Sequence, residues 1–283
     1  MYKKKTQKTK NQHQDESDAY LDSNHDYSEE ATVFIKEFDM NEMPPQSVED
    51  NNGVKIVVIG KPGTGKSSII TSIVDAKKHI IPVSQIFSGT EDSNGFYCKR
   101  FPAITVYNNL KDLKPIENFI SRQKYSKRYL DNPWAVQIID DCTDDPKLFT
   151  KPLFQSYYKN GRHWKMMHIL SLQYCLDIKP VIRTNIDYSF IMRETNKKNR
   201  KALFENYASA VENMGEFETL MDALTEDYCS MVVVNRNTSN DIQDCVRWYK
   251  ADIDRIRNFR FGAEDFWLFN DQRFNDSYED PIY

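Results

Sequence analysis

The feature that most constrains this chain is a glycine-rich turn between two apolar segments. Residues 54–59 (VKIVVI) form a largely apolar run, which is typical of a buried strand. After the turn the chain resumes as an amphipathic segment that opens with a lysine and two serines. The turn fits the pattern G-x-x-x-x-G-K-[ST] with Gly60, Gly65, Lys66 and Ser67. The sequence therefore predicts a strand, a phosphate-binding P-loop and a helix, in that order.

Each residue type in this turn suits a bound phosphate group. Glycines let successive backbone N–H groups curl around phosphate oxygens, and the helix N-terminus adds a partial positive charge. Lys66 is expected to reach the β- and γ-phosphates, and the Ser67 hydroxyl to ligate Mg²⁺. A chance match is the alternative, but the flanking strand and helix favour a bound nucleoside triphosphate. The expected nucleotide-binding residues are Gly60, Lys61, Pro62, Gly63, Thr64, Gly65, Lys66, Ser67 and Ser68.

Charge is unevenly distributed along the 283 residues, whose formal net charge is −4. Residues 1–50 carry 6 Lys and Arg against 12 Asp and Glu, whereas residues 51–283 carry 32 against 30. The larger part is close to neutral. Contact with nucleic acid would therefore depend on local basic patches rather than on global charge.

The composition also predicts how the chain is divided. Residues 1–30 are expected to be a disordered polar tail, because they offer too little apolar surface to offset the entropy of ordering. The basic octet in this tail is interpreted as solvated, with a localisation signal or a DNA-binding arm as alternatives. Residues 31–283 are expected to form a single P-loop ATPase domain with its core at about 54–251. Its C-terminal segment mixes aromatic and basic residues, and we favour docking onto the domain over stacking on single strands.

The five cysteines lack C-x-x-C or Cys/His ligand spacing. This pattern favours a reducing compartment and argues against a structural zinc site. No apolar run approaches the ~18 residues of a membrane-spanning helix. We therefore expect a soluble intracellular protein with no zinc.

A second decisive stretch is WAVQIIDDC (134–142), an apolar strand that ends in Asp140 and Asp141. It resembles a Walker B strand, whose final acid holds Mg²⁺ because a hard octahedral cation suits carboxylate oxygen. The neighbouring acid can polarise the attacking water as general base. A helix cap or turn is the alternative for such a pair. The upstream P-loop favours Asp140 as the Mg²⁺ residue and Asp141 as the catalytic residue.

Two further polar residues are candidates for catalysis. Gln173 lies near the end of the apolar run 166–174, and a strand placed between the P-loop strand and the Walker B strand would bring its amide beside the γ-phosphate. An amide that only caps a strand end has equal weight. Arg183 precedes a strand expected at 188–193 and is a candidate arginine finger, in its own or a neighbouring subunit. A surface ion pair is the alternative for this arginine.

The remaining pattern indicates an α/β fold. Further strands are expected at 31–40, 79–87, 103–107, 229–237 and 244–251, the last two as a hairpin, and helices at 110–130 and at 197–228 with a break at Met214 and Gly215. The basic helix 110–130 is a candidate phosphate contact, although a solvated face is the favoured interpretation. Alternation of strands and helices implies a mainly parallel P-loop NTPase sheet flanked by helices, with a C-terminal hairpin extension.

The sequence also resembles the DNA-packaging ATPases of nucleocytoplasmic large DNA viruses, within the FtsK/HerA superfamily of P-loop motors. The resemblance covers roughly residues 54–251. It rests on the number and order of GKPGTGKSS, SGTEDSNGFY, IIDDC, SLQY, the pattern P-x-I-R-x-N-x-D from Pro180 to Asp187, and VVVNRNTSNDIQDCVRWYKA. The roles that it implies are phosphate and Mg²⁺ binding by Lys66 and Ser67, Mg²⁺ binding by Asp140, catalysis by Asp141, sensing by Gln173 and an arginine finger at Arg183. Asp141 departs from the Glu that many relatives in the wider superfamily carry at this position.

The resemblance further implies a homo-oligomeric ring around double-stranded DNA. The expected function is an ATP-driven motor, with ATP and Mg²⁺ as cofactors, that moves viral DNA into a preformed capsid. Capsid or portal vertex proteins are expected partners, and the expected location is the viral factory in the host cytoplasm and the virion. One alternative is a P-loop phosphotransferase in which residues 193–200 (RETNKKNR) close as a lid. Another is a nucleotide-binding regulator without turnover.

Overall fold

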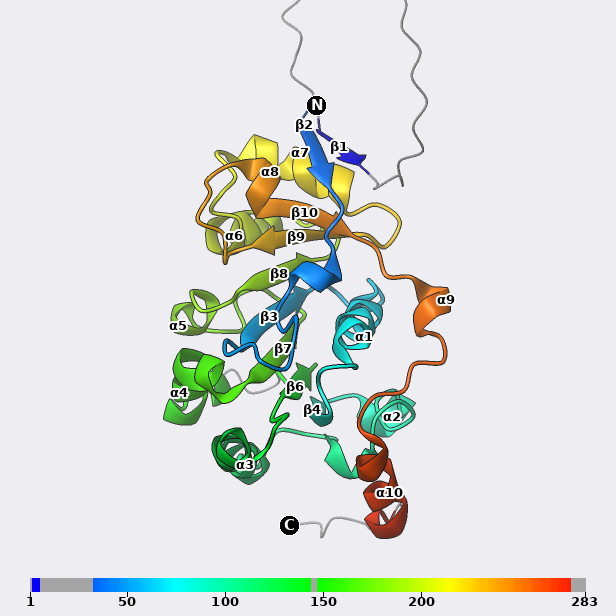
Figure 1. Ribbon diagram of the computed structural model, residues 1–283. Helices are drawn as coiled ribbons and strands as arrows, with labels where there is room; N and C mark the ends of the chain where they lie inside the picture. The colour runs from blue at the N-terminus through cyan, green and yellow to red at the C-terminus, as the bar shows by residue number, and fades with distance from the viewer. Residues whose placement is uncertain (1, 6–32, 144–146, 276–283) are drawn as a thin grey trace, which may run out of the picture.

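The apolar run before the P-loop forms the central strand of the molecule, β3 (Val54–Ile59). The computed structural model of the chain (Figure 1) describes residues 2–5, 33–143 and 147–275. Within it β3 lies between β7 (Met166–Leu172) and β8 (Tyr188–Ile191), parallel to both. All six residues of β3 are buried and five of them are apolar, as is typical of parallel strands that are covered on both faces.

The described residues place eight strands in the main sheet, in the order β10-β9-β8-β3-β7-β6-β4-β5. The other five strands of this sheet are β4 (Val83–Ser88), β5 (Val106–Tyr107), β6 (Ala135–Asp140), β9 (Ser230–Val234) and β10 (Val246–Tyr249). β9 pairs antiparallel with β8 and β10, and the other neighbours are parallel. The predicted mainly parallel sheet with a C-terminal hairpin is therefore confirmed. β7 lies between β3 and β6, the position that the Gln173 hypothesis requires.

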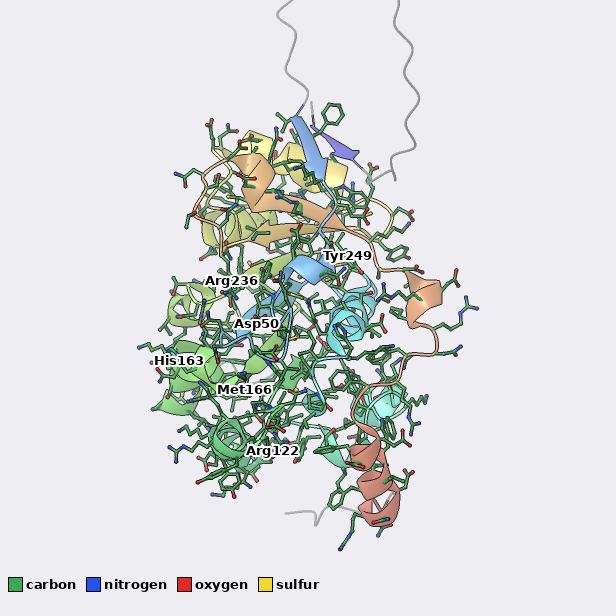
Figure 2. All side chains as sticks on the ribbon, viewed as in Figure 1. Asp50, Arg122, His163, Met166, Arg236 and Tyr249 are labelled. Atoms are coloured by element: carbon green, nitrogen blue, oxygen red, sulfur yellow. The ribbon has the colours of Figure 1, made fainter. Side chains whose placement is uncertain are left out.

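Helices cover both faces of this sheet (Figure 1). On one face lie α1 (Lys66–Lys77), α2 (Glu91–Asn94) and α9 (Ile253–Ile256). On the other lie α3 (Lys114–Tyr129), α4 (Pro152–Asn160), α5 (Pro180–Arg183) and α6 (Lys197–Tyr207), and α7 (Met214–Leu224) extends the same core. Side chains fill the space between these layers (Figure 2). Ile56 and Val58 join the core under α1, whereas Val57 and Ile59 join the opposite core, because successive strand residues point to opposite faces.

Short elements complete the fold. Short helices between the strands are η1 (Met40–Glu42), η2 (Ala103–Thr105), η3 (Leu148–Thr150), η4 (Gly161–Trp164) and α8 (Ile242–Cys245), and α10 (Glu264–Arg273) follows the last strand. Before α10, Phe259 and Phe261 are buried against Phe101, with ring centroids 5.7 and 5.1 Å from it. The packing of these two rings agrees with the docking interpretation of the C-terminal segment.

The turn after α1 shortens one expected strand. The apolar run 79–87 predicts a strand, but β4 begins only at Val83. Ile80 and Ile81 both donate backbone hydrogen bonds to the Lys77 carbonyl at 3.0 Å, which closes a turn at the end of the helix. Their apolar side chains are buried in that turn rather than in the sheet. A short apolar run is expected both for a buried strand and for a buried turn, so the sequence pattern alone does not distinguish the two structures.

The break between α6 and α7 lies before Met214 and Gly215 rather than at them. α6 ends at Tyr207 and α7 begins at Met214. The Asn213 side chain accepts a hydrogen bond from the Glu216 backbone N–H at 3.0 Å. Asparagine is among the strongest N-cap residues. This cap starts the helix one residue before Gly215, which the first turn accommodates.

Four residues of the expected disordered tail form a strand. β1 (Tyr2–Lys5) pairs in parallel with β2 (Val33–Lys36), outside the main sheet. The expectation therefore does not hold for these four residues, because backbone pairing satisfies N–H and C=O groups whatever the side chains are. Residue 1 and residues 6–30 lie outside the described part of the chain, and their disorder stays a prediction.

A buried polar contact lies near the amino ends of β3 and β7. His168 of β7 is 2% exposed, and its Nε2 atom shares a hydrogen bond with the Tyr158 hydroxyl. Lys55, its neighbour across the strand pair, donates from Nζ to the Tyr158 carbonyl. Burial, followed by the Lys55 charge, lowers the pKa of His168 to about 3. His168 therefore stays neutral in the folded protein at pH values where an exposed histidine takes up a proton.

This contact predicts an acid-sensitive fold. An unfolded histidine titrates near ~6.5, so protons bind preferentially to the unfolded chain as pH falls below that value. We expect His168→Gln to lose less unfolding free energy than wild type between neutral pH and about pH 5, as measured by urea denaturation. The exposed His79→Gln is the matched control and should behave as wild type. Equal acid sensitivity in His168→Gln and wild type would contradict this role of His168.

Candidate nucleotide-binding site

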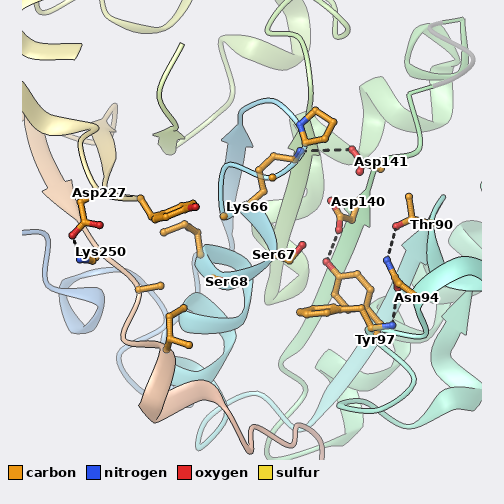
Figure 3. Close-up of a pocket in the computed structure, with 18 residues that line it drawn as sticks. Lys66, Ser67, Ser68, Thr90, Asn94, Tyr97, Asp140, Asp141, Asp227 and Lys250 are labelled. Carbon is orange, nitrogen blue, oxygen red and sulfur yellow. Dashed lines mark hydrogen bonds and ion pairs between the residues drawn. The ribbon is translucent and has the colours of Figure 1, made fainter. Parts of the chain in front are cut away.

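A cavity of about 660 Å³ opens at the carboxyl ends of β3 and β6 (Figure 3). Ligands of open α/β sheets bind outside the carboxyl ends of the strands, so the position fits a substrate site. The P-loop and the first turn of α1 form its floor. Their lining residues are Pro62, Gly63, Gly65, Lys66, Ser67 and Ser68. The other predicted binding residues, Gly60, Lys61 and Thr64, belong to the loop but do not line this cavity.

The loop has the backbone geometry that its glycines predict. Gly63 and Gly65 have φ angles of 78° and 96°, in the left-handed region that side chains disfavour. Gly60 is required for a different reason: a Cβ atom there would lie 2.6 Å from the Cβ of Met192. Gly65 directly precedes α1, so the N-terminus of this helix is presented to the cavity. Helix N-termini of this kind attract anions.

The two lysines of the loop point in different directions. The Nζ atom of Lys66 lies 3.4 Å from the Lys61 carbonyl and 3.9 Å from Oδ1 of Asp141, at the cavity. The Lys61 ammonium is instead 2.6 Å from Oε1 of Glu194, which follows β8. Glu194 also accepts hydrogen bonds from the Asn196 backbone N–H and the Asn199 amide, so it is firmly held. Of the two, only Lys66 is placed to meet a phosphate in the cavity.

Asp140, the last residue of β6, is buried at the cavity wall. Its Oδ2 atom accepts a hydrogen bond from the Tyr97 hydroxyl at 2.8 Å. Its Oδ1 atom is also buried. Burial raises the pKa of this carboxyl group above its usual value, and a hydrogen bond from the Ser171 hydroxyl of β7 partly offsets that rise. Asp140 is therefore a firmly held carboxylate at the cavity wall.

Asp141 turns out of the strand toward the P-loop. Its φ angle is 50°, a left-handed conformation that aspartate tolerates better than most residues. Its Oδ1 atom accepts a hydrogen bond from the Gln173 amide at 3.1 Å and faces Lys66. Gly89 permits this bend, because a Cβ at that position would lie 2.2 Å from the Asp141 carbonyl oxygen. The structure therefore brings Lys66, Asp141 and Gln173 together from three strand ends.

Arg183 is not at this cavity. It lies in α5, where its guanidinium donates to the Ile178 carbonyl. The chain then continues to Asp187, whose backbone N–H bonds to the Lys55 carbonyl at the amino end of β3. α5 and α1 lie on opposite sides of the sheet (Figure 1). An arginine finger at this position would have to act on a neighbouring subunit.

The sequence reasoning assigned no role to several residues of the cavity wall. Tyr97 contacts Asp140, and Glu91 holds the Tyr97 backbone N–H through both carboxylate oxygens at 3.0 and 3.1 Å. Both residues lie in the motif SGTEDSNGFY, which the sequence analysis singled out. The sequence did not indicate that Tyr97 of this motif contacts Asp140. Asp227, Tyr228 and Lys250 line the far end of the cavity. Lys250 lies in VVVNRNTSNDIQDCVRWYKA, whereas Asp227 and Tyr228 belong to no motif.

The residues at the cavity suit Mg²⁺. This cation keeps several waters and binds one or two protein oxygens together with substrate phosphates. Ser67 and Asp140 both line the cavity, and the hydroxyl of one and the carboxylate of the other match that demand. The described residues contain no group of three or more His, Cys, Asp or Glu side chains that could hold a metal by themselves.

The arginines of the alternative lid, residues 193–200, are engaged by another acid. Nη2 of Arg193 lies 3.5 Å from Oδ1 of Asp222, and the Arg200 guanidinium bonds to both oxygens of the same carboxylate. Asp222 raises the pKa of Arg200, as expected for a paired guanidinium. This segment begins α6 and packs on the domain. It does not line the nucleotide cavity.

The fold and the loop place the chain in the class of P-loop NTPases. The chain is 44% identical over 250 residues to protein 075L of Invertebrate iridescent virus 6, which covers 86% of this chain and 96% of that protein. It is 42% identical over 244 residues to protein 088R of Invertebrate iridescent virus 3, covering 84% and 93%. A similar solved structure is the genome packaging NTPase B204 from Sulfolobus turreted icosahedral virus 2 in complex with AMPPCP, with a TM-score of 0.50, 16% identity and coverage of 71% and 98%.

The chain belongs to the same family as 075L and 088R, and the predicted relationship to proteins of nucleocytoplasmic large DNA viruses is confirmed. It matches no described protein-family profile. The likeness to B204 concerns the fold. Across the part of the chain that the structure describes, we find no helix with the length and apolarity to cross a membrane.

Tyr97→Phe tests the contact that supports Asp140. Removal of the hydroxyl leaves one oxygen of a buried carboxylate without its donor, which typically costs about 1–3 kcal/mol. We expect the free energy of unfolding in urea to fall by that amount. Tyr129→Phe, which alters an exposed tyrosine on α3, should change it by less than about 0.5 kcal/mol. Equal stability of Tyr97→Phe and the control would contradict the importance of this hydrogen bond.

Proposed function

We propose that this protein is an ATP-driven motor that hydrolyses ATP to move double-stranded viral DNA into a preformed capsid. The observation that carries the proposal is the convergence of the P-loop, the acid pair of β6 and Gln173 on one cavity. Family membership among large DNA viruses supports it, as does a fold shared with a genome packaging NTPase that binds AMPPCP. The place of action is then the viral factory in the host cytoplasm, and the virion vertex where capsid or portal proteins receive the DNA.

The phosphates of ATP are proposed to lie along the P-loop. The backbone N–H groups of the loop and the N-terminus of α1 attract their charge, and Lys66 reaches the β- and γ-phosphates. Mg²⁺, when bound, would neutralise charge on the β- and γ-oxygens, held by the Ser67 hydroxyl and, through water, by Asp140. Asp140 is a rigid member of this set because Tyr97 fixes one of its oxygens.

Asp141 is proposed as the general base of hydrolysis. The oxygen of a water molecule forms a bond to the γ-phosphorus, the bond to the ADP oxygen breaks, and the water proton passes to Asp141. Gln173 donates to Oδ1 of Asp141, which leaves the other carboxylate oxygen to face water. The Gln173 amide is therefore placed to orient the base and to sense the γ-phosphate.

Asp141→Asn tests this assignment. Asparagine preserves the size of the side chain and an acceptor for Gln173, but it cannot take the proton. We expect AMPPCP binding to stay within about twofold of wild type while the steady-state ATPase rate falls by about 10²- to 10⁴-fold. Lys66→Ala should instead weaken binding itself. The exposed Asp131→Asn is the matched control. Hydrolysis by Asp141→Asn at the wild-type rate would overturn the assignment of the base.

The motor proposal also predicts a response to DNA. Phosphate-backbone contacts are sequence-independent and weaken with salt, so duplex DNA of any sequence should raise the ATPase rate, less so as salt rises. The active species is proposed to be a homo-oligomeric ring, with Arg183 reaching the site of its neighbour. We expect a mass of several subunits, and a loss of turnover without loss of AMPPCP binding in Arg183→Ala. A monomer that phosphorylates a nucleotide, unaffected by DNA, would favour a phosphotransferase instead.

A further inference from the structure

An exposed tyrosine forms the end of the cavity that lies away from the acid pair. Tyr228 lines the cavity, yet 66% of its surface is exposed. Its ring lies close to the P-loop: the Cδ1 atom is 3.7 Å from the position that a Cβ would have at Gly65. The apolar side chains of Ala251 and Ile253 line the same cavity from the segment that follows β10. An aromatic ring that is open to water beside a phosphate-binding loop provides a surface for a flat apolar group.

The backbone that carries Tyr228 is unfavourable for a tyrosine. Asp227 and Tyr228 have φ angles of 51° and 59°, and the Cys229 N–H donates to the Glu226 carbonyl at 3.0 Å. Two central residues with positive φ and this hydrogen bond are features of turns in which Gly, Asn and Asp predominate. A bulky aromatic residue in the left-handed region is an outlier, and such outliers gather at functional sites. Glycine or asparagine in place of Tyr228 would stabilise this turn more than tyrosine does.

The turn is held in place at the end of β10. Asp227 forms an ion pair with Lys250, the residue that follows this strand, and both line the cavity. Figure 3 shows Asp227 and Lys250 on one side of Lys66, Ser67 and Ser68, with Asp140 and Asp141 on the other. The cavity thus has two ends with the P-loop between them.

The chemistry of the acid end fixes the direction of a bound nucleotide. The γ-phosphate has to face Asp140 and Asp141, where the cation and the attacking water are proposed to be. The β- and α-phosphates then follow the loop past Ser67 and Ser68, so the ribose and base extend to the opposite end. That end of the cavity carries the ring of Tyr228.

We propose that Tyr228 is the stacking platform for the base of the nucleoside triphosphate, with the apolar groups of Ala251 and Ile253 beside it. The inference deepens the proposed function, because it rests on a triphosphate at the P-loop. Stacking strength grows with the area of the base, so the platform favours purine over pyrimidine nucleotides. Aromatic stacking contributes enough to change affinity by about tenfold or more.

The test uses the full-length protein with Mg²⁺ and three probes, namely AMPPCP, its uridine counterpart, and inorganic tripolyphosphate, in binding calorimetry. Tyr228→Asn removes the ring at a residue type that tolerates the left-handed backbone. We expect it to weaken AMPPCP binding about tenfold or more, to reduce the preference for the adenine analogue over the uridine one, and to leave tripolyphosphate binding unchanged. Its melting temperature should equal or exceed that of wild type, because the strain of the turn is relieved. Tyr129→Asn is the control, since Tyr129 is also 66% exposed but lies outside the cavity.

Three results would overturn the inference. Unchanged AMPPCP affinity in Tyr228→Asn would show that the base does not bind at this end of the cavity. An equal loss of tripolyphosphate binding would mean that Tyr228 supports the loop rather than the base, as would a marked fall in melting temperature. Because each probe is measured by binding, a protein that binds AMPPCP through Tyr228 but never hydrolyses ATP would contradict the motor proposal and not this one.

Discussion

Asp141 holds the candidate site together, because it accepts a hydrogen bond from Gln173 and faces Lys66. These three residues follow β6, β7 and β3, which are adjacent and parallel, so their carboxyl ends meet at one edge of the sheet. The close approach of Gly89 to the Asp141 carbonyl permits the bend that turns the carboxylate toward the loop. The position of the Asp141 carboxylate therefore depends on the order of the three strands and on the absence of a side chain at Gly89. A change in either would separate the phosphate-binding groups from the proposed base.

The sequence predicted the local part of this arrangement. The P-loop and the acid pair are each encoded within a few consecutive residues, and strand alternation with helices indicated the parallel sheet that places β7 between β3 and β6. The contact between Tyr97 and Asp140 was not predictable, because it joins residues 43 positions apart, one in the segment after α2 and the other at the end of β6. Tyr228 was missed for another reason: its significance lies in a φ angle and in proximity to Gly65, which no residue pattern expresses.

Burial and charge are divided between the two ends of the cavity. At one end a buried Asp140 and a bent Asp141 gather negative charge, which Lys66 and a bound cation would balance. At the other end an exposed ring and two apolar side chains offer a surface for a base. Between them the N-terminus of α1 presents positive potential. Because the two ends of the cavity differ in charge and polarity, a nucleoside triphosphate would bind in a single direction.

The most direct test of the central claim is the fate of the γ-phosphate when the protein turns over ATP in water labelled with heavy oxygen. Mass spectrometry of the released inorganic phosphate reports which molecule attacked the phosphorus. If water attacks the γ-phosphorus at this site, each released phosphate carries one labelled oxygen, and duplex DNA increases the amount of labelled product without changing its labelling. If the γ-phosphate appears on a second substrate, or no labelled phosphate is formed with DNA present, this site is not that of a DNA-driven ATP hydrolase.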